Sequence, residues 1–211
     1  MIRIITIPKI NEQVEWFDHN TTCIYGTNGT GKTLLMKGMM QWCEEHGYDY
    51  AFYTPFDAEG QMEEIFSTAG DEVIYLAAKQ IGTWVINFDE TVKAWWKMEH
   101  DGKDPEGDEH YRDIPLLKES IRMSGAGYTK MFVMGAKGLL NQFNNYYFLD
   151  TPEQSIHPLI VEHILNWIQN LFPYMKIIVA THSDHMIEQT HQYEQLIRLP
   201  ADFLSQKNAR G

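Results

Sequence analysis

Residues 26–33 read Gly-Thr-Asn-Gly-Thr-Gly-Lys-Thr, an uninterrupted G-x-x-x-x-G-K-T loop. Its three glycines let the backbone take conformations that are closed to other residues, so successive N–H groups can point inward at a phosphate. Such a loop needs a buried strand before it and a helix after it, because the helix adds the positive end of its dipole. The loop therefore predicts a strand, loop and helix that together bind a nucleoside triphosphate.

The residues on both sides of the loop have the pattern that this arrangement requires. Thr22, Cys23, Ile24 and Tyr25 form an apolar run typical of a buried strand. After the loop, apolar residues recur at the spacing of one helix face, namely Leu34, Leu35, Met36, Met39, Met40 and Cys43. Gly47 follows where a helix commonly ends. These flanks favour nucleotide binding over a chance glycine-rich turn.

Six loop residues are expected to bind a nucleoside triphosphate and Mg²⁺: Asn28, Gly29, Thr30, Gly31, Lys32 and Thr33. Lys32 would reach the β- and γ-phosphates as a point charge. The Thr33 hydroxyl would coordinate Mg²⁺, which keeps most of its water and takes only a few protein oxygens. The loop itself does not distinguish ATP from GTP. No aromatic residue stands out for stacking on the base, and Trp16 and Phe17 on the early strands are the two that could serve.

Length and composition predict one domain. The 211 residues, of which 44% are hydrophobic, can bury one sizeable core, so we expect a single domain at 1–211 with a helical subdomain inserted at about 60–140. The net charge of −12 disfavours broad nonspecific binding of nucleic acid without excluding a DNA partner. No apolar run of about 18 residues occurs, and the start of the chain is too strand-like for a signal peptide, so we expect a soluble, cytoplasmic protein without membrane insertion. Cys23 and Cys43 fit small buried hydrophobic residues rather than a disulfide.

Strands alternate with helices along the rest of the chain. Strands are expected at 2–7, 14–17, 50–53, 146–149, 177–180 and 196–199. Apolar residues at helical spacing predict helices at 131–140 and 158–171, and either a long helix or a helical subdomain from Ile74 to Trp95. This order indicates an α/β fold with a mainly parallel sheet covered on both faces and with antiparallel strands at the N-terminus.

Residues 99–112 are acidic, contain glycine and lack periodicity, which is typical of an exposed loop. Their carboxylates, together with His100 or His110, could suggest a metal site. Lys103 and Pro105 break the spacing of an EF-hand, however. A solvated loop is therefore the preferred interpretation.

Three further segments carry side chains suited to phosphate chemistry. One expected strand ends in Asp150, which places a carboxylate at the carboxyl edge of the sheet, where ligands of open α/β sheets bind and where it could hold Mg²⁺. The next strand leads to His182 at the same edge, either as a phosphate contact or as a buried structural histidine. Ser124, Gly125 and Gly127 form a Ser-Gly-x-Gly turn before a helix, which is a weak signal when taken alone.

The order of these motifs resembles that of the ATP-binding-cassette ATPases, which contain a P-loop NTPase core. Asp150 follows Ser124 by 26 residues, and His182 follows Asp150 by 32. In that superfamily two nucleotide domains pack head to tail, with each ATP held between the loop of one and the signature turn of the other. The resemblance implies a homodimer or a pair of ATPases. By this resemblance, Ser124, Gly125 and Gly127 contact the γ-phosphate of the ATP that a second subunit holds. His182 contacts the γ-phosphate of the ATP in its own subunit.

Residues 149–158 read Leu-Asp-Thr-Pro-Glu-Gln-Ser-Ile-His-Pro and resemble a segment of the RecF/OLD-like branch, which includes ATPases of DNA repair and of phage defence. This branch implies an ATPase or ATP-gated dimerising switch that acts with a separate effector protein or with DNA. Those families place glutamate directly after the aspartate, whereas this chain has Thr151, which cannot act as a carboxylate base. We therefore expect slow hydrolysis unless Glu153 or a residue of a partner takes that role.

The resemblance also implies a glutamine that links the metal to the helical subdomain. Gln61 is the first candidate for this metal contact, and Gln80 is the second. Two other functions stay open. The chain could be the nucleotide-binding subunit of an ABC transporter, which its length and motif spacing resemble. It could also be a nucleotide-bound scaffold that never hydrolyses ATP, and Thr151 is the signal for that alternative.

Overall fold

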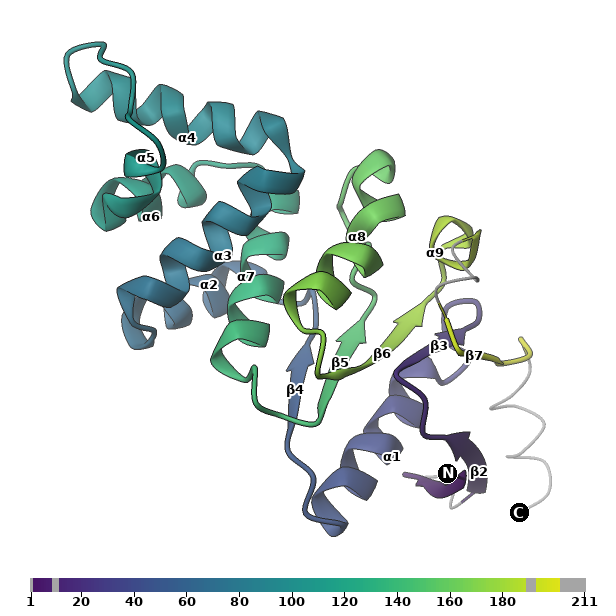
Figure 1. Cartoon of the computed structure of the whole chain (residues 1–211). Coiled ribbons are helices and arrows are strands. Elements are labelled where there is room, and N and C mark those ends of the chain that lie inside the picture. Colours follow the sequence, from purple (N-terminus) through teal and green to yellow (C-terminus); the bar gives the residue numbers. More distant parts are fainter. Residues whose placement is uncertain (1, 9–11, 189–192, 202–211) are drawn as a thin grey trace. The chain divides into compact units, whose positions relative to one another are not determined.

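The computed structural model describes residues 2–8, 12–188 and 193–201 (Figure 1). Contacts between residues divide the chain into two compact units. The sheet unit consists of Met1–Thr54, Asn141–Glu153 and Val161–Gly211, and the helical unit consists of Pro55–Leu140 and Gln154–Ile160. The chain thus passes from one unit to the other four times. That the two units form a single domain stays a prediction.

A five-stranded sheet is the centre of the sheet unit. Its order is β4-β5-β6-β3-β7, and all neighbouring strands are parallel. The strands are β3 (Thr21–Tyr25), β4 (Tyr50–Tyr53), β5 (Tyr146–Asp150), β6 (Lys176–Thr181) and β7 (Gln195–Arg198). Every residue of β5 is buried, as expected for a parallel strand that is covered on both faces. The α/β fold with a mainly parallel sheet, predicted from the sequence, is confirmed.

The register of the strands aligns the carboxyl ends of four of them. Tyr25 at the end of β3 pairs with Thr181 of β6 and with Arg198 of β7. Asp150 at the end of β5 pairs with Ala180 of β6. Strand β6 therefore lies between the strand that leads to the glycine-rich loop and the strand that ends in Asp150.

An antiparallel pair at the N-terminus, also predicted, is confirmed as β1 (Ile2–Ile7) and β2 (Glu12–Phe17). Helix α1 (Lys32–Glu45) packs against β1. Buried residues of the pair and of α1 belong to one core cluster, which includes Ile5, Ile7, Trp16, Leu35, Met36, Met39 and Trp42. This cluster anchors α1, whose first residue directly follows the glycine-rich loop.

Two further helices belong wholly or mostly to the sheet unit. Helix α8 (Pro158–Leu171) begins with proline, which is favoured in the first turn because its missing N–H would have no partner there. Its bounds are those predicted from the sequence. Helix α9 (Asp184–Glu188) follows β6 and His182 after a short turn.

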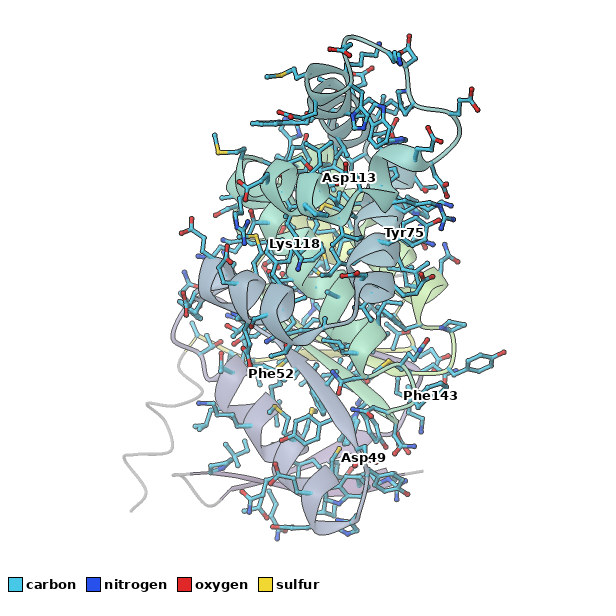
Figure 2. The ribbon with its side chains drawn as sticks, turned by 90° about the vertical axis from the view of Figure 1, so that its left-hand side faces the viewer. Asp49, Phe52, Tyr75, Asp113, Lys118 and Phe143 are labelled. Carbon is cyan, nitrogen blue, oxygen red and sulfur yellow. The ribbon has the colours of Figure 1, made fainter. Side chains whose placement is uncertain are left out.

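The helical unit contains six helices within its described residues. They are α2 (Ala58–Thr68), α3 (Asp71–Trp84), α4 (Ile86–Glu99), α5 (Glu109–Arg112), α6 (Ile114–Arg122) and α7 (Ala126–Leu140). Helix α7 packs against α2 and α3, and α4 packs against α6. Figure 2 labels Lys118 of α6. Its ammonium donates a hydrogen bond to the Phe66 carbonyl oxygen near the end of α2, at 2.9 Å.

A single long helix from Ile74 to Trp95 is wrong, and the alternative of several helices holds. Helix α3 ends at Trp84 and α4 begins at Ile86, because Val85 has the extended angles φ −128° and ψ 92°. The apolar repeat nevertheless runs through the break, since both helices bury one face, α3 against α7 and α4 against α6. Periodicity alone could not show this break.

The prediction of an exposed loop at residues 99–112 is wrong for its last part. His110 and Tyr111 of α5 are only 2% and 3% exposed. His110 Nε2 lies 2.9 Å from Asp89 Oδ1, and the Tyr111 hydroxyl donates to the same oxygen at 2.8 Å. Gly82 leaves room for this, because a Cβ there would lie 1.7 Å from the Tyr111 hydroxyl oxygen. Among the described residues, no group of three or more His, Cys, Asp or Glu side chains could hold a metal ion.

Candidate functional site

The glycine-rich loop has the backbone expected of a phosphate cradle. Gly29 and Gly31 have positive φ angles of 81° and 98°, in the left-handed region that favours glycine. Gly26 is required for space, because a Cβ on it would lie 2.6 Å from the Thr30 hydroxyl oxygen. Asn28 and Gly29 are exposed at the tip of the loop. This conformation suits a loop that directs its N–H groups toward an anion.

Lys32 is fixed to the loop that precedes it. Its side chain is buried, and the ammonium donates to the carbonyl oxygens of Gly26 at 2.7 Å and of Thr27 at 2.9 Å. Burial lowers the pKa of Lys32, while the charges of Asp150 and Glu153 act in the opposite direction. The ammonium is therefore held at the loop by acceptors that phosphate oxygens could replace.

Thr33 and Asp150 meet although 117 residues separate them. The Thr33 hydroxyl donates to Asp150 Oδ2 at 2.9 Å. Asp150 is only 4% exposed, and this burial raises its pKa, whereas the Thr33 hydrogen bond and the charges of Lys32 and Lys37 lower it. A hydroxyl and a carboxylate are hard oxygen donors of the kind that Mg²⁺ prefers, and Mg²⁺ needs few of them because it keeps several waters. The pair fits a magnesium ion.

Thr151, directly after Asp150, has a strained backbone. Its φ is 46°, in the left-handed region, which is unusual for a β-branched residue and costs about 1–3 kcal/mol. Its N–H donates to the Ala180 carbonyl oxygen at 2.8 Å, which ties the turn to β6. Such strain clusters at functional sites, so the turn after Asp150 is a candidate part of the site on structural grounds as well.

Glu153 lies at the same edge of the sheet and is 8% exposed. Its Oε1 accepts from the Thr181 hydroxyl at 2.5 Å and from the His182 N–H at 3.4 Å, and lies 3.6 Å from His182 Nδ1. Its Oε2 is buried and has no hydrogen-bond partner among the described residues. A buried carboxylate oxygen without a partner is costly, so this atom marks a place that a water or a ligand group would stabilise.

His182 does not fit the alternative of a buried structural histidine. Its side chain is 42% exposed, while its backbone is held by Glu153. The Ser183 N–H donates to the Thr181 hydroxyl at 3.0 Å, which closes the turn after β6. The imidazole is therefore presented to solvent from a turn that is fixed at its base.

The Ser-Gly-x-Gly turn belongs to the helical unit and joins α6 to α7. The Ser124 hydroxyl lies 2.9 Å from the Ser120 carbonyl oxygen and 2.8 Å from that of Ile121, so its one proton closes the end of α6. Gly125 has open space where a Cβ would stand, whereas a Cβ on Gly127 would lie 3.1 Å from the Ser155 carbonyl oxygen. Gly127 thus allows close packing against Ser155, whereas Gly125, just before α7, has no atom close to the position of a Cβ.

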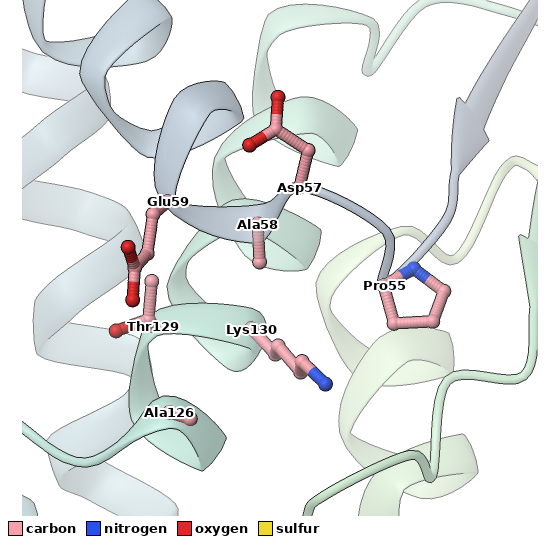
Figure 3. A pocket seen from close by; sticks show the side chains of 7 residues that line it. All are labelled: Pro55, Asp57, Ala58, Glu59, Ala126, Thr129 and Lys130. Atoms are coloured by element: carbon pink, nitrogen blue, oxygen red, sulfur yellow. The ribbon is translucent and has the colours of Figure 1, made fainter.

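Three hollows border this turn within the helical unit, and one of them is lined by Gly125 and Gly127 themselves together with Tyr128, Ser155, Ile156, His157 and Ile160. A second, of about 200 Å³, is lined by Pro55, Asp57, Ala58, Glu59, Ala126, Thr129 and Lys130 (Figure 3). The Lys130 ammonium donates to the Gln154 carbonyl oxygen at 3.2 Å, and burial lowers the pKa of Lys130. The third hollow, of about 460 Å³, is lined by Ser124 and by three carboxylates and one guanidinium, those of Asp57, Glu59, Glu63 and Arg122. The hollow beside Ser124 is therefore mainly acidic.

The candidate glutamines both lie on helices of the helical unit, Gln61 on α2 and Gln80 on α3. The Gln61 amide donates to the Phe56 carbonyl oxygen at 2.5 Å. Thr33 and Asp150 belong to the sheet unit, so the role of Gln61 as a metal contact stays a prediction.

Trp16 is wrong as a candidate for stacking on the base. Its side chain is fully buried, and its ring packs against those of Trp42 and Tyr146 at centroid distances of 5.8 and 5.5 Å. Side chains alternate between the two faces of β2, and the sequence did not show which face is buried. The face that carries Trp16 packs into the core around α1. The side chain of Phe17 lies outside the described residues.

Sequence reasoning missed two residues at the edge of the sheet. Thr181 joins Glu153 to the turn after β6, and Tyr25 donates from its hydroxyl to Asp184 Oδ1 at 2.7 Å. The only signal for Thr181 is its place next to His182, and no motif points to Tyr25. Both depend on β6 lying between β3 and β5.

No helix within the described residues is both long enough and apolar enough to cross a bilayer.

Comparisons with known proteins support the fold and nothing finer. The sequence matches no model of a known protein family, and no curated protein is recognisably similar to it. Among solved structures, the chain resembles MJ1267, an ATP-binding cassette of an ABC transporter, in its ADP conformation. The TM-score is 0.53 at 14% sequence identity, and the match covers 94% of this chain and 87% of that one. The chain therefore has the fold of an ABC-type P-loop ATPase cassette.

Proposed function

We propose that this chain binds MgATP at the edge of its sheet and hydrolyses it slowly. The observation that carries the proposal is the 2.9 Å hydrogen bond between Thr33 and Asp150, beside a glycine-rich loop that holds Lys32. A hydroxyl, a carboxylate and an ammonium are thus gathered at one loop from segments far apart in the sequence. This is the set of groups that a magnesium triphosphate requires.

The residues of the loop would divide the work of binding. Backbone N–H groups around Gly29 and Gly31 would bind phosphate oxygens, and Lys32 would exchange its two carbonyl acceptors for oxygens of the β- and γ-phosphates. Thr33 and Asp150 would hold Mg²⁺, which neutralises charge on the phosphate oxygens when it is bound. Since folding already sets the positive φ angles of Gly29 and Gly31, the backbone of the loop should change little on binding.

Orientation of the attacking water is the weak step of this site. Thr151 cannot accept a proton as a carboxylate would, and losing a positioned base costs on the order of 10²- to 10⁴-fold in rate. Glu153 could partly replace it, because its Oε2 has no partner among the described residues while its Oε1 is tied to Thr181. His182 would contact the γ-phosphate from the exposed turn after β6. Slow turnover follows.

Pairing of two copies would complete the site. Ser124, Gly125 and Gly127 would face the γ-phosphate held by a second copy, with the positive end of α7 behind them. A role with a separate effector or with DNA, in repair or in phage defence, is supported only by the segment at residues 149–158. A cytoplasmic location belongs to the same proposal.

Two other functions can be distinguished from this proposal by experiment. A scaffold that binds but never hydrolyses ATP is favoured by Thr151. A transporter subunit is favoured only by its length and motif spacing, because likeness to a transporter cassette at this identity shows the fold alone.

Phosphate release, measured against a Lys32→Ala variant, tests the proposal. Slow release that depends on Lys32 supports an ATPase, and release equal to the variant supports the scaffold. Sedimentation with and without MgATP tests pairing, with Ser124→Arg as the disrupting variant. Ser67→Arg is its matched control, since the Ser67 hydroxyl also bonds to a carbonyl oxygen at a helix end, that of Glu64 at 2.8 Å. Mass spectrometry of the native complex would identify an effector or a membrane partner.

A further inference from the structure

The turn that carries His182 is held from both neighbouring strands. On the β5 side, Glu153 accepts from Thr181 and from the His182 backbone N–H. On the β3 side, the Tyr25 hydroxyl donates to Asp184 Oδ1 at 2.7 Å. The exposed imidazole of His182 lies in the chain between these two attachments.

The Tyr25 contact joins the loop to this turn directly. Tyr25 is the last residue of β3 and precedes Gly26, the first residue of the glycine-rich loop. Asp184 is the first residue of α9 and comes two residues after His182. Arg198 of β7 places its guanidinium over the Tyr25 ring, 5.6 Å from the centroid, which adds a second contact to the ring. The hydroxyl thus has a defined direction.

We propose that Tyr25 is a positioning residue, whose hydroxyl acts through Asp184 to hold His182 where it would contact the γ-phosphate. This inference rests on the proposed function, in which His182 makes that contact. Tyr25 itself touches neither nucleotide nor metal in this proposal. Its effect is confined to the place of the imidazole relative to the loop.

The energetics of the contact favour a local role over a role in overall stability. The pair is exposed, and an exposed hydrogen bond contributes little to the stability of the whole unit, because water replaces it. Helix α9 has five residues, too few to be stable without contacts to the rest of the chain. Loss of the bond should therefore loosen the turn at residues 182–184 without unfolding the sheet unit.

The helical unit offers a matched control. There the Tyr75 hydroxyl donates to Asp108 Oδ2 at 2.6 Å, and the Arg112 guanidinium lies 4.7 Å from the centroid of the Tyr75 ring. This group has the same three residue types, with Lys79 as an additional donor to the Tyr75 hydroxyl at 2.7 Å. Its unit contains neither the glycine-rich loop nor Asp150, and of the predicted metal contacts it contains only Gln61. Tyr75→Phe therefore removes an equivalent hydroxyl at a place without a predicted effect on nucleotide.

The test measures discrimination of the γ-phosphate, which needs no turnover. Dissociation constants are determined for ADP and for the imido analogue of ATP, both with Mg²⁺. Tyr25→Phe and Asp184→Ala should each reduce the preference for the ATP analogue by about two- to tenfold and leave ADP binding unchanged. Asp184→Asn retains an oxygen acceptor and should restore the wild-type preference. Tyr75→Phe should have no effect.

The outcomes separate this inference from the proposed function. A double variant, Tyr25→Phe with Asp184→Ala, should lose no more preference than either single variant, because both remove one contact. If His182→Ala reduces the preference but Tyr25→Phe does not, the inference is overturned and the proposed function stands. If wild-type protein shows no Lys32-dependent binding, the proposed function fails first and the inference with it.

Discussion

The carboxyl edge of the sheet unit and the Ser-Gly-x-Gly turn of the helical unit use their conspicuous residues in different ways. At the edge, Thr33 bonds to Asp150, and Glu153 bonds to the turn of His182, so the predicted site residues bond to one another. At the turn, Ser124 bonds to carbonyl oxygens of its own helix, and Gly127 packs against Ser155. Folding of one chain thus assembles the edge, whereas it only places the turn at a helix start.

The two regions also differ in the state of their cation. At the edge, the Lys32 ammonium donates only to loop carbonyl oxygens, which phosphate oxygens could replace. In the hollow beside Ser124, Arg122 is already paired with Glu63 and Glu119, and Asp57 and Glu59 add further negative charge. An isolated triphosphate would be repelled by that hollow, and only a charge-neutralised one could approach it closely. Nucleotide affinity should therefore belong to the edge alone, and the turn should matter only for pairing.

The largest expected effect comes from Lys32→Ala. Because two charge-assisted contacts to phosphate would be lost, at about 1.5–3 kcal/mol each, the dissociation constant for MgATP should rise by about 100-fold or more. Isothermal titration measures it. Lys37→Ala removes an exposed lysine from the same helix and should change binding little. Equal affinity in the wild type and the Lys32 variant would break the comparison, since the edge would then not be the binding region.

Thr151→Glu should give the next largest effect. A carboxylate directly after Asp150 would supply the base that the chain lacks, so phosphate release should increase on the order of 10²-fold. Thr151→Gln is the control, because it has a similar size without the charge and should stay slow. An increase of the same size in both variants would point to relief of backbone strain at φ 46° instead.

Local sequence patterns predicted the parts of the molecule that local interactions determine. The strand before the loop, helix α1 and helix α8 all follow from apolar periodicity and from end signals such as Pro158, and all three are present. The pairing of Thr33 with Asp150 was implied by the motif order, because both residues follow strands that end at one edge. These predictions needed no knowledge of which strands are neighbours.

Long-range pairing explains what the sequence could not show. The Thr181 bond to Glu153 requires β6 to lie beside β5, and no local pattern encodes that order. The break at Val85 is hidden because two helices that bury one face each keep a common repeat. The burial of Trp16 depends on which face of β2 meets α1. In each case the competing interaction comes from a segment distant in the sequence.

Asp150→Asn should separate stability from function at the edge. Burial raises the pKa of Asp150 in the folded state above its unfolded value, so the folded protein binds the proton more tightly. Stability from this group is present below the unfolded pKa and is lost as pH rises through the folded one. The variant should therefore melt a few degrees higher than wild type at pH 7, with no such gain at pH 3, and should lose Mg²⁺-dependent nucleotide binding. Thermal unfolding at pH 7 and pH 3 tests the stability, and nucleotide titration with and without Mg²⁺ tests the binding. A variant that is less stable than wild type at pH 7 would contradict the prediction.

Gly127→Ala should have the smallest of these effects and defines the turn most sharply. Its new Cβ would stand 3.1 Å from the Ser155 carbonyl oxygen, so the backbone must shift, at a cost of about 1 kcal/mol in the free energy of unfolding. Gly125→Ala meets no atom within 4 Å and should be as stable as wild type.

MgATP binding by single copies should be unchanged in both the Gly127→Ala and the Gly125→Ala variants, because neither residue belongs to the edge. If the turn acts only in pairing, Gly125→Ala should weaken MgATP-dependent sedimentation without any loss of stability. Weakened binding by single copies in either variant would instead place the turn within the site of its own chain.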